Sequence, residues 1–141
     1  MWLAYHDRLK TKQKLMSIGV VDDDKCPICG MQAETVEHLY FECGFSRQCV
    51  DKLRQWLGFS WNIKNLQDLL RKRRLSRPKQ RIIEAVMGNL IYFIWRVRNE
   101  AVWHRKVMTV RKVVETIKTE SKLRLNYLQW KRSVTAWVRT L

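Results

Sequence analysis

The chain has few of the residues that interrupt regular structure. Its 141 residues include five glycines and two prolines, too few for an all-β fold, which needs a turn about every ten residues. The longest apolar run, residues 90–95, is far shorter than the ~20 residues of a transmembrane helix. Charges interrupt the first ten residues, where a signal peptide has its apolar core. We therefore expect an intracellular, mainly helical protein without membrane contact.

Acidic residues are also scarce, and their distribution is uneven. The chain has 28 Lys and Arg against 13 Asp and Glu, a net charge of +15. Residues 1–60 are balanced at eight of each sign, whereas residues 61–141 have twenty basic and five acidic residues. Such asymmetry indicates a polyanionic partner, most often nucleic acid. A solvated basic face is the simpler alternative.

The apolar spacing predicts several helices. Short ones are expected from Thr11 to Gly19 and from Thr35, and another from Ser46 to Gly58. Residues 65–73 form a further candidate. Ser76 with Pro78 and then Thr109 are expected to open two long helices. The inward positions predicted for the two long helices are Ile82, Ile83, Val86, Leu90, Phe93, Ile94, Val97 and Ala101, then Val110, Val113, Val114, Ile117, Leu125 and Leu128.

Four metal-ligand types lie within eighteen residues, as Cys26-x2-Cys29-x8-His38-x4-Cys43. Three Cys and one His are a standard ligand set for one structural Zn²⁺. A disulfide is disfavoured in a reducing compartment, and a Cys-x-x-Cys redox pair would need a βαβ context that is lacking. Buried residues with no common role would not explain the clustering. Cys49 is expected to be an ordinary core residue.

A basic segment, residues 71–81, contains no acidic side chain. It is predicted to contact phosphates, and its composition is also typical of a nuclear-localisation patch. Trp103, Trp130 and Trp137 stand among cations, where they would stack on unpaired bases or equally cover a packing seam. The basic residues predicted to bind are Arg71, Lys72, Arg73, Arg74, Arg77, Lys79 and Arg81.

The metal motif and its flanks resemble a known family. The run RLKTKQKLMSIGVVDDDKCPICGMQAETVEHLYFECGFSRQ is similar to the zinc-binding region downstream of the reverse transcriptase in plant LINE-type (non-LTR) retrotransposons. Residues 95–99, Trp-Arg-Val-Arg-Asn, resemble a W-x-x-R-N element that follows this region. The resemblance implies zinc on the four ligands and a nucleic-acid-handling role beside a polymerase.

These observations predict a mainly α fold in which a Cys3His zinc module, residues 1–60, precedes a basic bundle or hairpin of long amphipathic helices, residues 61–141. No catalytic triad, carboxylate pair or phosphate loop is present, so we expect a non-catalytic module that binds nucleic acid, RNA in preference to DNA. The alternative is a structural component of a larger ribonucleoprotein or protein assembly. The expected compartment is the nucleus, or otherwise an organelle, and no small-molecule substrate is expected.

Overall fold

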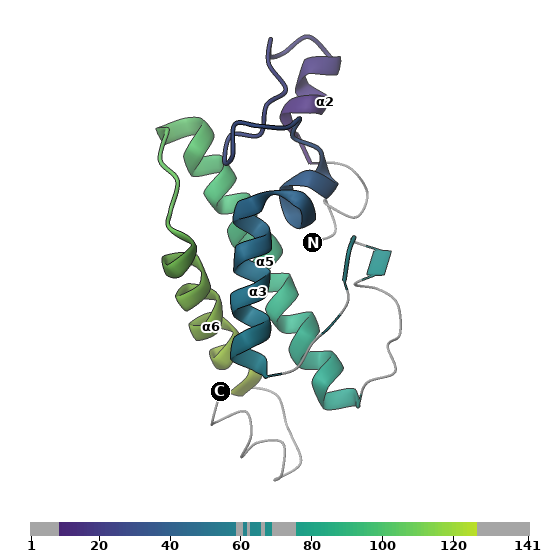
Figure 1. Cartoon of the computed structure of the whole chain (residues 1–141), viewed down its shortest axis with the longest axis vertical. Coiled ribbons are helices and arrows are strands. Elements are labelled where there is room, and N and C mark those ends of the chain that lie inside the picture. Colours follow the sequence, from purple (N-terminus) through teal and green to yellow (C-terminus); the bar gives the residue numbers. More distant parts are fainter. Residues whose placement is uncertain (1–8, 59–60, 62, 66, 69–75, 127–141) are drawn as a thin grey trace.

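The computed structural model describes residues 9–58, 61, 63–65, 67–68 and 76–126. The elements in chain order are α2 (Lys12–Ser17), a π-helical turn η1 (His38–Glu42), α3 (Gly44–Leu57), α5 (Arg77–His104) and α6 (Val110–Asn126) (Figure 1). Extended pairing within these residues is confined to an isolated antiparallel bridge between Lys25 and Ala33. The predicted mainly α fold, with the Cys3His group ahead of long helices, is confirmed.

The long helix α5 begins where its sequence signals place it. Ser76 is the N-cap and Pro78 lies in the first turn, where its missing N–H costs no hydrogen bond. All the positions predicted to face the core are buried. The helix ends at Arg105, whose left-handed backbone (φ +52°) cannot continue it. No described helix is long and apolar enough to cross a membrane.

The last helix, α6, folds back beside α5 to complete a hairpin (Figure 1). Val113, Val114, Ile117 and Leu125 are buried as predicted. Val110 packs partly buried against the same core, and Leu128 lies outside the described residues. A hydrogen bond of 2.9 Å from Asn89 Nδ2 to Ser121 Oγ joins the two helices. The predicted hairpin of amphipathic helices is therefore present.

The start of α3 differs from the sequence prediction. The helix begins at Gly44, with Cys43 as its N-cap, and not after Ser46. The buried Ser46 hydroxyl donates instead to the Leu39 carbonyl oxygen, at 2.5 Å, and so ties α3 to η1. Helix formation can start earlier because Cys43, with a non-helical backbone (φ −56°, ψ 130°), ends η1 directly before Gly44. Gly58, with φ +67°, ends α3 as predicted.

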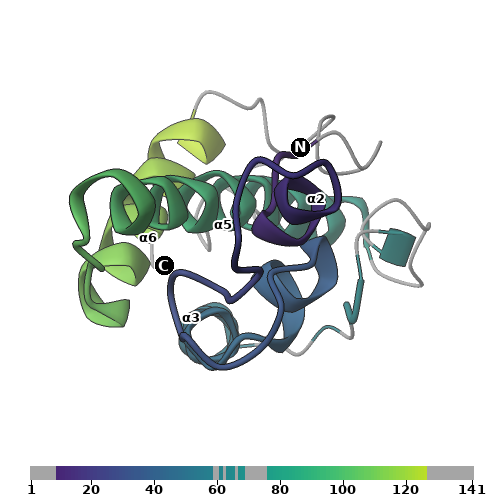
Figure 2. The same ribbon diagram turned by 90° about the horizontal axis from the view of Figure 1, so that it is seen from above.

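One apolar core runs through both halves of the chain. It includes Leu53 from α3, Ile83 and Ile94 from α5 and Ile117 from α6. Seen from above, α3 lies beside α5 (Figure 2). The predicted helix at 65–73 falls largely outside the described residues. The division into 1–60 and 61–141 stays a prediction.

Candidate metal centre

The first two ligands lie on a tight turn. The Cys26 N–H donates to the Gln32 carbonyl oxygen (2.8 Å), and the Gly30 N–H donates to the Cys26 carbonyl oxygen (2.8 Å). Gly30 has φ +69°, a conformation that side chains with a Cβ rarely adopt. The turn therefore directs both the Cys26 and the Cys29 sulfur towards one point.

The other two ligands lie at the ends of η1. The residue directly before η1 is Glu37 and not the predicted cap Thr35, but the Thr35 hydroxyl does accept a hydrogen bond from the His38 N–H (2.8 Å). The Cys43 N–H then donates to the His38 carbonyl oxygen (2.7 Å), five residues back. An α-helix would bond residues four apart and rotate residue 43 away from residue 38. The wider π-helical turn brings the two ligands over one another.

The four side chains converge on one point. Their ligand atoms all lie within 4.8 Å of one another, and Cys29 Sγ is 3.3 Å from His38 Nε2. Ligand atoms around a tetrahedral Zn²⁺ lie ~3.5–3.8 Å apart, given bond lengths of ~2.3 Å to sulfur and ~2.0 Å to nitrogen. The widest separation therefore needs to close by only ~1 Å. The residues fit zinc.

Without a metal, the Cys26 and Cys43 thiols are hydrogen-bonded to one another. The pKa of the Cys26 thiol is raised, first by its hydrogen bond with Cys43 and then by burial. The same hydrogen bond lowers the pKa of Cys43. A bound cation replaces these protons, because it is the thiolate that ligates. Cys49 differs: burial alone raises its pKa to about 12, so it remains a neutral core thiol, as predicted.

Protein side chains supply all four ligands of the group, and most of them are buried. Cys26 and Cys43 are fully buried, His38 is buried and Cys29 is partly exposed. Four protein ligands complete the tetrahedral coordination of zinc and leave no position for a reactive water. Three thiolates and one Zn²⁺ leave the site at about −1, so it has no attraction for phosphate. The centre is a structural zinc-binding group.

A buried ion pair attaches this module to α5, and sequence reasoning missed it. Arg98 Nε donates to Glu34 Oε1 (2.7 Å) and Arg98 Nη2 donates to Glu34 Oε2 (2.9 Å). The Glu34 side chain is 0% exposed and that of Arg98 6%. The sequence does contain a signal for this pair, because Arg98 is a charged residue on the apolar face of the long helix, four residues after Ile94.

Other contacts complete the network around this pair. Arg98 Nη2 also donates to the Lys10 carbonyl oxygen (3.1 Å), and the Lys12 N–H donates to Glu34 Oε2 (2.5 Å). The Arg98 guanidinium lies 4.9 Å from the centroid of the Trp95 ring, a cation–π distance. The W-x-x-R-N element thus has a structural role in this chain. It anchors the residues around the zinc group to the long helix.

The predicted nucleic-acid-binding residues lie on a separate part of the chain. Arg77, Lys79 and Arg81 are exposed on the first turns of α5. Arg71, Lys72, Arg73 and Arg74 lie outside the described residues, as do Trp130 and Trp137. Trp103, near the other end of α5, is 75% exposed.

Comparison with known proteins agrees with this site. The family model described as zinc-binding in reverse transcriptase matches residues 1–49. That range contains α2, all four ligands and the start of α3. No curated protein matched the chain, and no solved structure matched it. The first third of the chain is therefore similar to the zinc-binding region of reverse transcriptases, and zinc is the metal that its Cys3His group is built to hold.

Proposed function

We propose that the chain is a non-catalytic, zinc-stabilised module that binds nucleic acid, RNA in preference to DNA, through phosphate contacts of its basic helical region. The observation that carries the proposal is the charge division: residues 61–141 have twenty Lys and Arg against five Asp and Glu, whereas residues 1–60 are neutral. The likeness of residues 1–49 to the zinc-binding region of reverse transcriptases supports the same role.

The exposed start of α5 is the described part of this surface. Arg77 and Arg81 are four residues apart and therefore share one face of the helix, with Lys79 close by. Residues 71–81 contain no acidic side chain. Each cation that contacts a phosphate releases a counterion, so binding through this surface has a steep salt dependence.

A salt titration tests the proposal. Binding of the zinc-loaded chain to a single-stranded RNA is measured by fluorescence anisotropy between low and moderate salt. Arg77→Gln/Lys79→Gln/Arg81→Gln should flatten the slope of log K against log salt by ~2, at ~0.7 per phosphate contact on single strands. Duplex and single-stranded DNA are titrated in parallel to test the preference for RNA.

The matched control removes the same charge from the neutral half. Lys10, Lys14 and Lys52 are exposed there, and their combined change to Gln should leave most of the slope intact. Affinity that does not fall with added salt would refute the proposal. An equal loss in both triple variants would show that binding depends on net charge alone and not on the start of α5.

A structural role in a larger assembly is the second candidate. Tyr92 and Trp103 are 60% and 75% exposed on α5, and large exposed aromatic side chains mark contact surfaces in many complexes. In that case the isolated chain should self-associate until a partner covers them, and Tyr92→Ser/Trp103→Ser should restore a monomer in analytical ultracentrifugation.

A further inference from the structure

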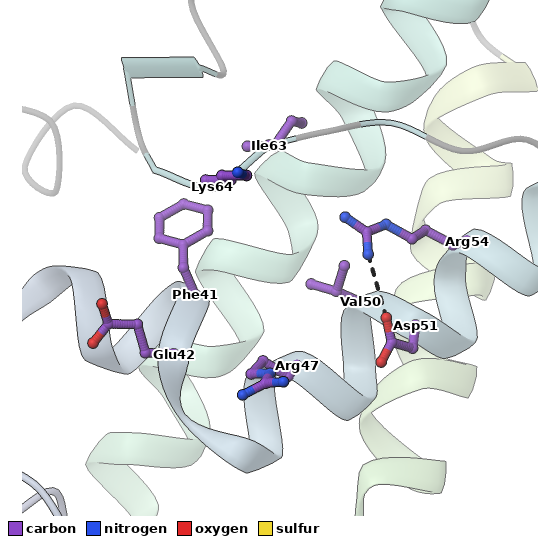
Figure 3. Close-up of a pocket in the computed structure, with 8 residues that line it drawn as sticks. All are labelled: Phe41, Glu42, Arg47, Val50, Asp51, Arg54, Ile63 and Lys64. Atoms are coloured by element: carbon purple, nitrogen blue, oxygen red, sulfur yellow. Dashed lines mark hydrogen bonds and ion pairs between the residues drawn. The ribbon is translucent and has the colours of Figure 1, made fainter.

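A pocket of about 400 Å³ lies between η1, the middle of α3 and residues 63–64 (Figure 3). None of the four zinc ligands lines it. Phe41 and Glu42, however, belong to the π-helical turn that carries His38 and Cys43 at its ends. The zinc group therefore holds one wall of the pocket in place.

The pocket has an apolar floor and a charged rim. Ile63 is buried, and Phe41 and Val50 are partly buried. Figure 3 shows the Phe41 ring and the Val50 side chain facing the 63–64 segment. The exposed lining residues are all charged: Glu42, Arg47, Asp51 and Lys64.

The cations of the rim differ in whether they form ion pairs and hydrogen bonds with other residues. Arg54 Nη1 contacts Asp51 Oδ1 (3.3 Å), and its Nη2 donates to the Trp61 carbonyl oxygen (2.9 Å), so Arg54 and Asp51 are held together. The side chains of Arg47 and Lys64 make no ion pair or hydrogen bond within the described part of the chain. Two cations are thus available to a ligand.

We propose that this pocket binds one unstacked nucleotide of a single-stranded nucleic acid. Its base packs on the Phe41 ring above Val50 and Ile63, and its phosphates contact Arg47 and Lys64. This inference rests on the proposed function and adds a site to it, outside the basic segment at 71–81. It assigns the zinc module a direct part in binding.

The lining selects this class of ligand. A bare anion would leave the apolar floor unfilled, and an apolar ligand would leave the two cations without a partner. A nucleotide supplies a flat base and an anionic phosphodiester together, and single strands present unstacked bases to aromatic side chains. The carboxylates of Glu42 and Asp51 disfavour a denser anion such as a triphosphate. Paired bases of a duplex cannot enter.

Paired variants test the site in the zinc-loaded full chain. Phe41→Leu keeps an apolar side chain but removes the ring, and it should weaken binding to a single-stranded oligonucleotide by ~5- to 100-fold, the range expected for one stacked base. Duplex binding should change by less than about twofold. Arg47→Gln/Lys64→Gln should reduce the salt slope on single strands by ~1.4.

The control double variant is Lys14→Gln/Lys52→Gln, which removes two exposed cations that do not line the pocket. It should reduce the salt slope by less than half of the reduction expected for Arg47→Gln/Lys64→Gln. Zinc content and the unfolding midpoint of Phe41→Leu establish that the variant is folded. Ultraviolet crosslinking of the unaltered chain to a 4-thiouridine oligonucleotide gives a readout that needs no variant, and crosslinked peptides should come from residues 41–64.

The outcomes separate the two proposals. Salt-sensitive binding that is unaffected by the pocket variants, with crosslinks confined to other peptides, would overturn the nucleotide pocket and leave the proposed function standing. Equal weakening of single-strand and duplex binding by Phe41→Leu would overturn the pocket as well. A chain that binds no oligonucleotide even at low salt would overturn both.

Discussion

The zinc module and the α5–α6 hairpin are stabilised in different ways. Between residues 9 and 43 the described elements are short, and no side chain of α2 within Lys12–Ser17 is fully buried. The hairpin, by contrast, consists of helices of 28 and 17 residues that bury a continuous apolar stripe. The long helices are held mainly by apolar packing, whereas a segment with such short elements gains much of its stability from a metal or an equivalent crosslink.

The two regions also differ in what they can offer a partner. The zinc group has four protein ligands and a charge of about −1 when zinc is bound, while the net positive charge of the chain lies after residue 60. They are nevertheless connected by the buried pair of Glu34 and Arg98. The zinc module therefore contributes ordered structure, and the region after residue 60 contributes the net positive charge.

Removing one zinc ligand should have the largest effect. Cys43→Ser should abolish stoichiometric zinc and unfold the module, because apparent zinc-binding energies of ~10–16 kcal/mol match or exceed a whole domain's stability of ~5–15 kcal/mol. Hydrogen exchange should show lost protection in residues 20–43 and retained protection in α5 and α6.

Cys49→Ala is the matched control, because Cys49 is equally buried but is not a ligand. It should keep one zinc per chain, measured by elemental analysis, and lower the free energy of unfolding by only ~1 kcal/mol. A Cys43→Ser protein that retains one zinc and native protection would contradict the closed Cys3His assignment.

Breaking the buried ion pair should have the next largest effect. Arg98→Met leaves Glu34 charged and unpaired in the core, and it should reduce the free energy of unfolding by ~3–5 kcal/mol, measured by urea denaturation. Arg96→Met, on the exposed side of the same helix, should change it by less than ~0.5 kcal/mol.

A double variant measures the coupling between the regions. Glu34→Gln keeps an acceptor for the Lys12 N–H and removes the charge that Arg98 pairs with. Glu34→Gln/Arg98→Met should therefore cost at least ~1 kcal/mol less than the sum of the single changes. Strict additivity would show that the pair does not join the regions.

Acid should release zinc from the module before it affects the hairpin. The pKa of the Cys26 thiol is raised in the metal-free site, so this thiol is protonated at neutral pH and zinc must displace its proton. Zinc affinity therefore rises with pH, by about tenfold per pH unit for each proton released. Competition titrations between pH 6 and pH 8 measure the slope, and a pH-independent affinity would contradict it.

The smallest expected effects come from removing one capping hydrogen bond in each region. Thr35→Ala removes the 2.8 Å hydrogen bond to the His38 N–H and should cost ~1 kcal/mol, lowering zinc affinity about fivefold. Thr109→Ala removes a longer bond of 3.3 Å to the Lys112 N–H. It should cost ~0.5 kcal/mol and leave zinc affinity unchanged, as measured by calorimetry.

Several elements were predictable because their signals are local. Ser76, Pro78 and Gly58 set helix ends through their own backbone preferences, and the apolar spacing of α5 identified its buried face. The ligands were predictable because three Cys and one His at this spacing have few other uses. The start of α3 was predicted wrongly because the Ser46 hydroxyl donates to the Leu39 carbonyl oxygen in η1 and does not cap its own helix.

The ligand set, the mainly helical class and the separation of charge follow from composition, spacing and capping, because these act over a few neighbouring residues. Three features became visible only in the folded chain. His38 and Cys43 converge through a π-helical turn, and Arg98 reaches Glu34 across 64 positions. Phe41 and Lys64 line one pocket. Such pairings depend on how the helices pack together. No local preference specifies them.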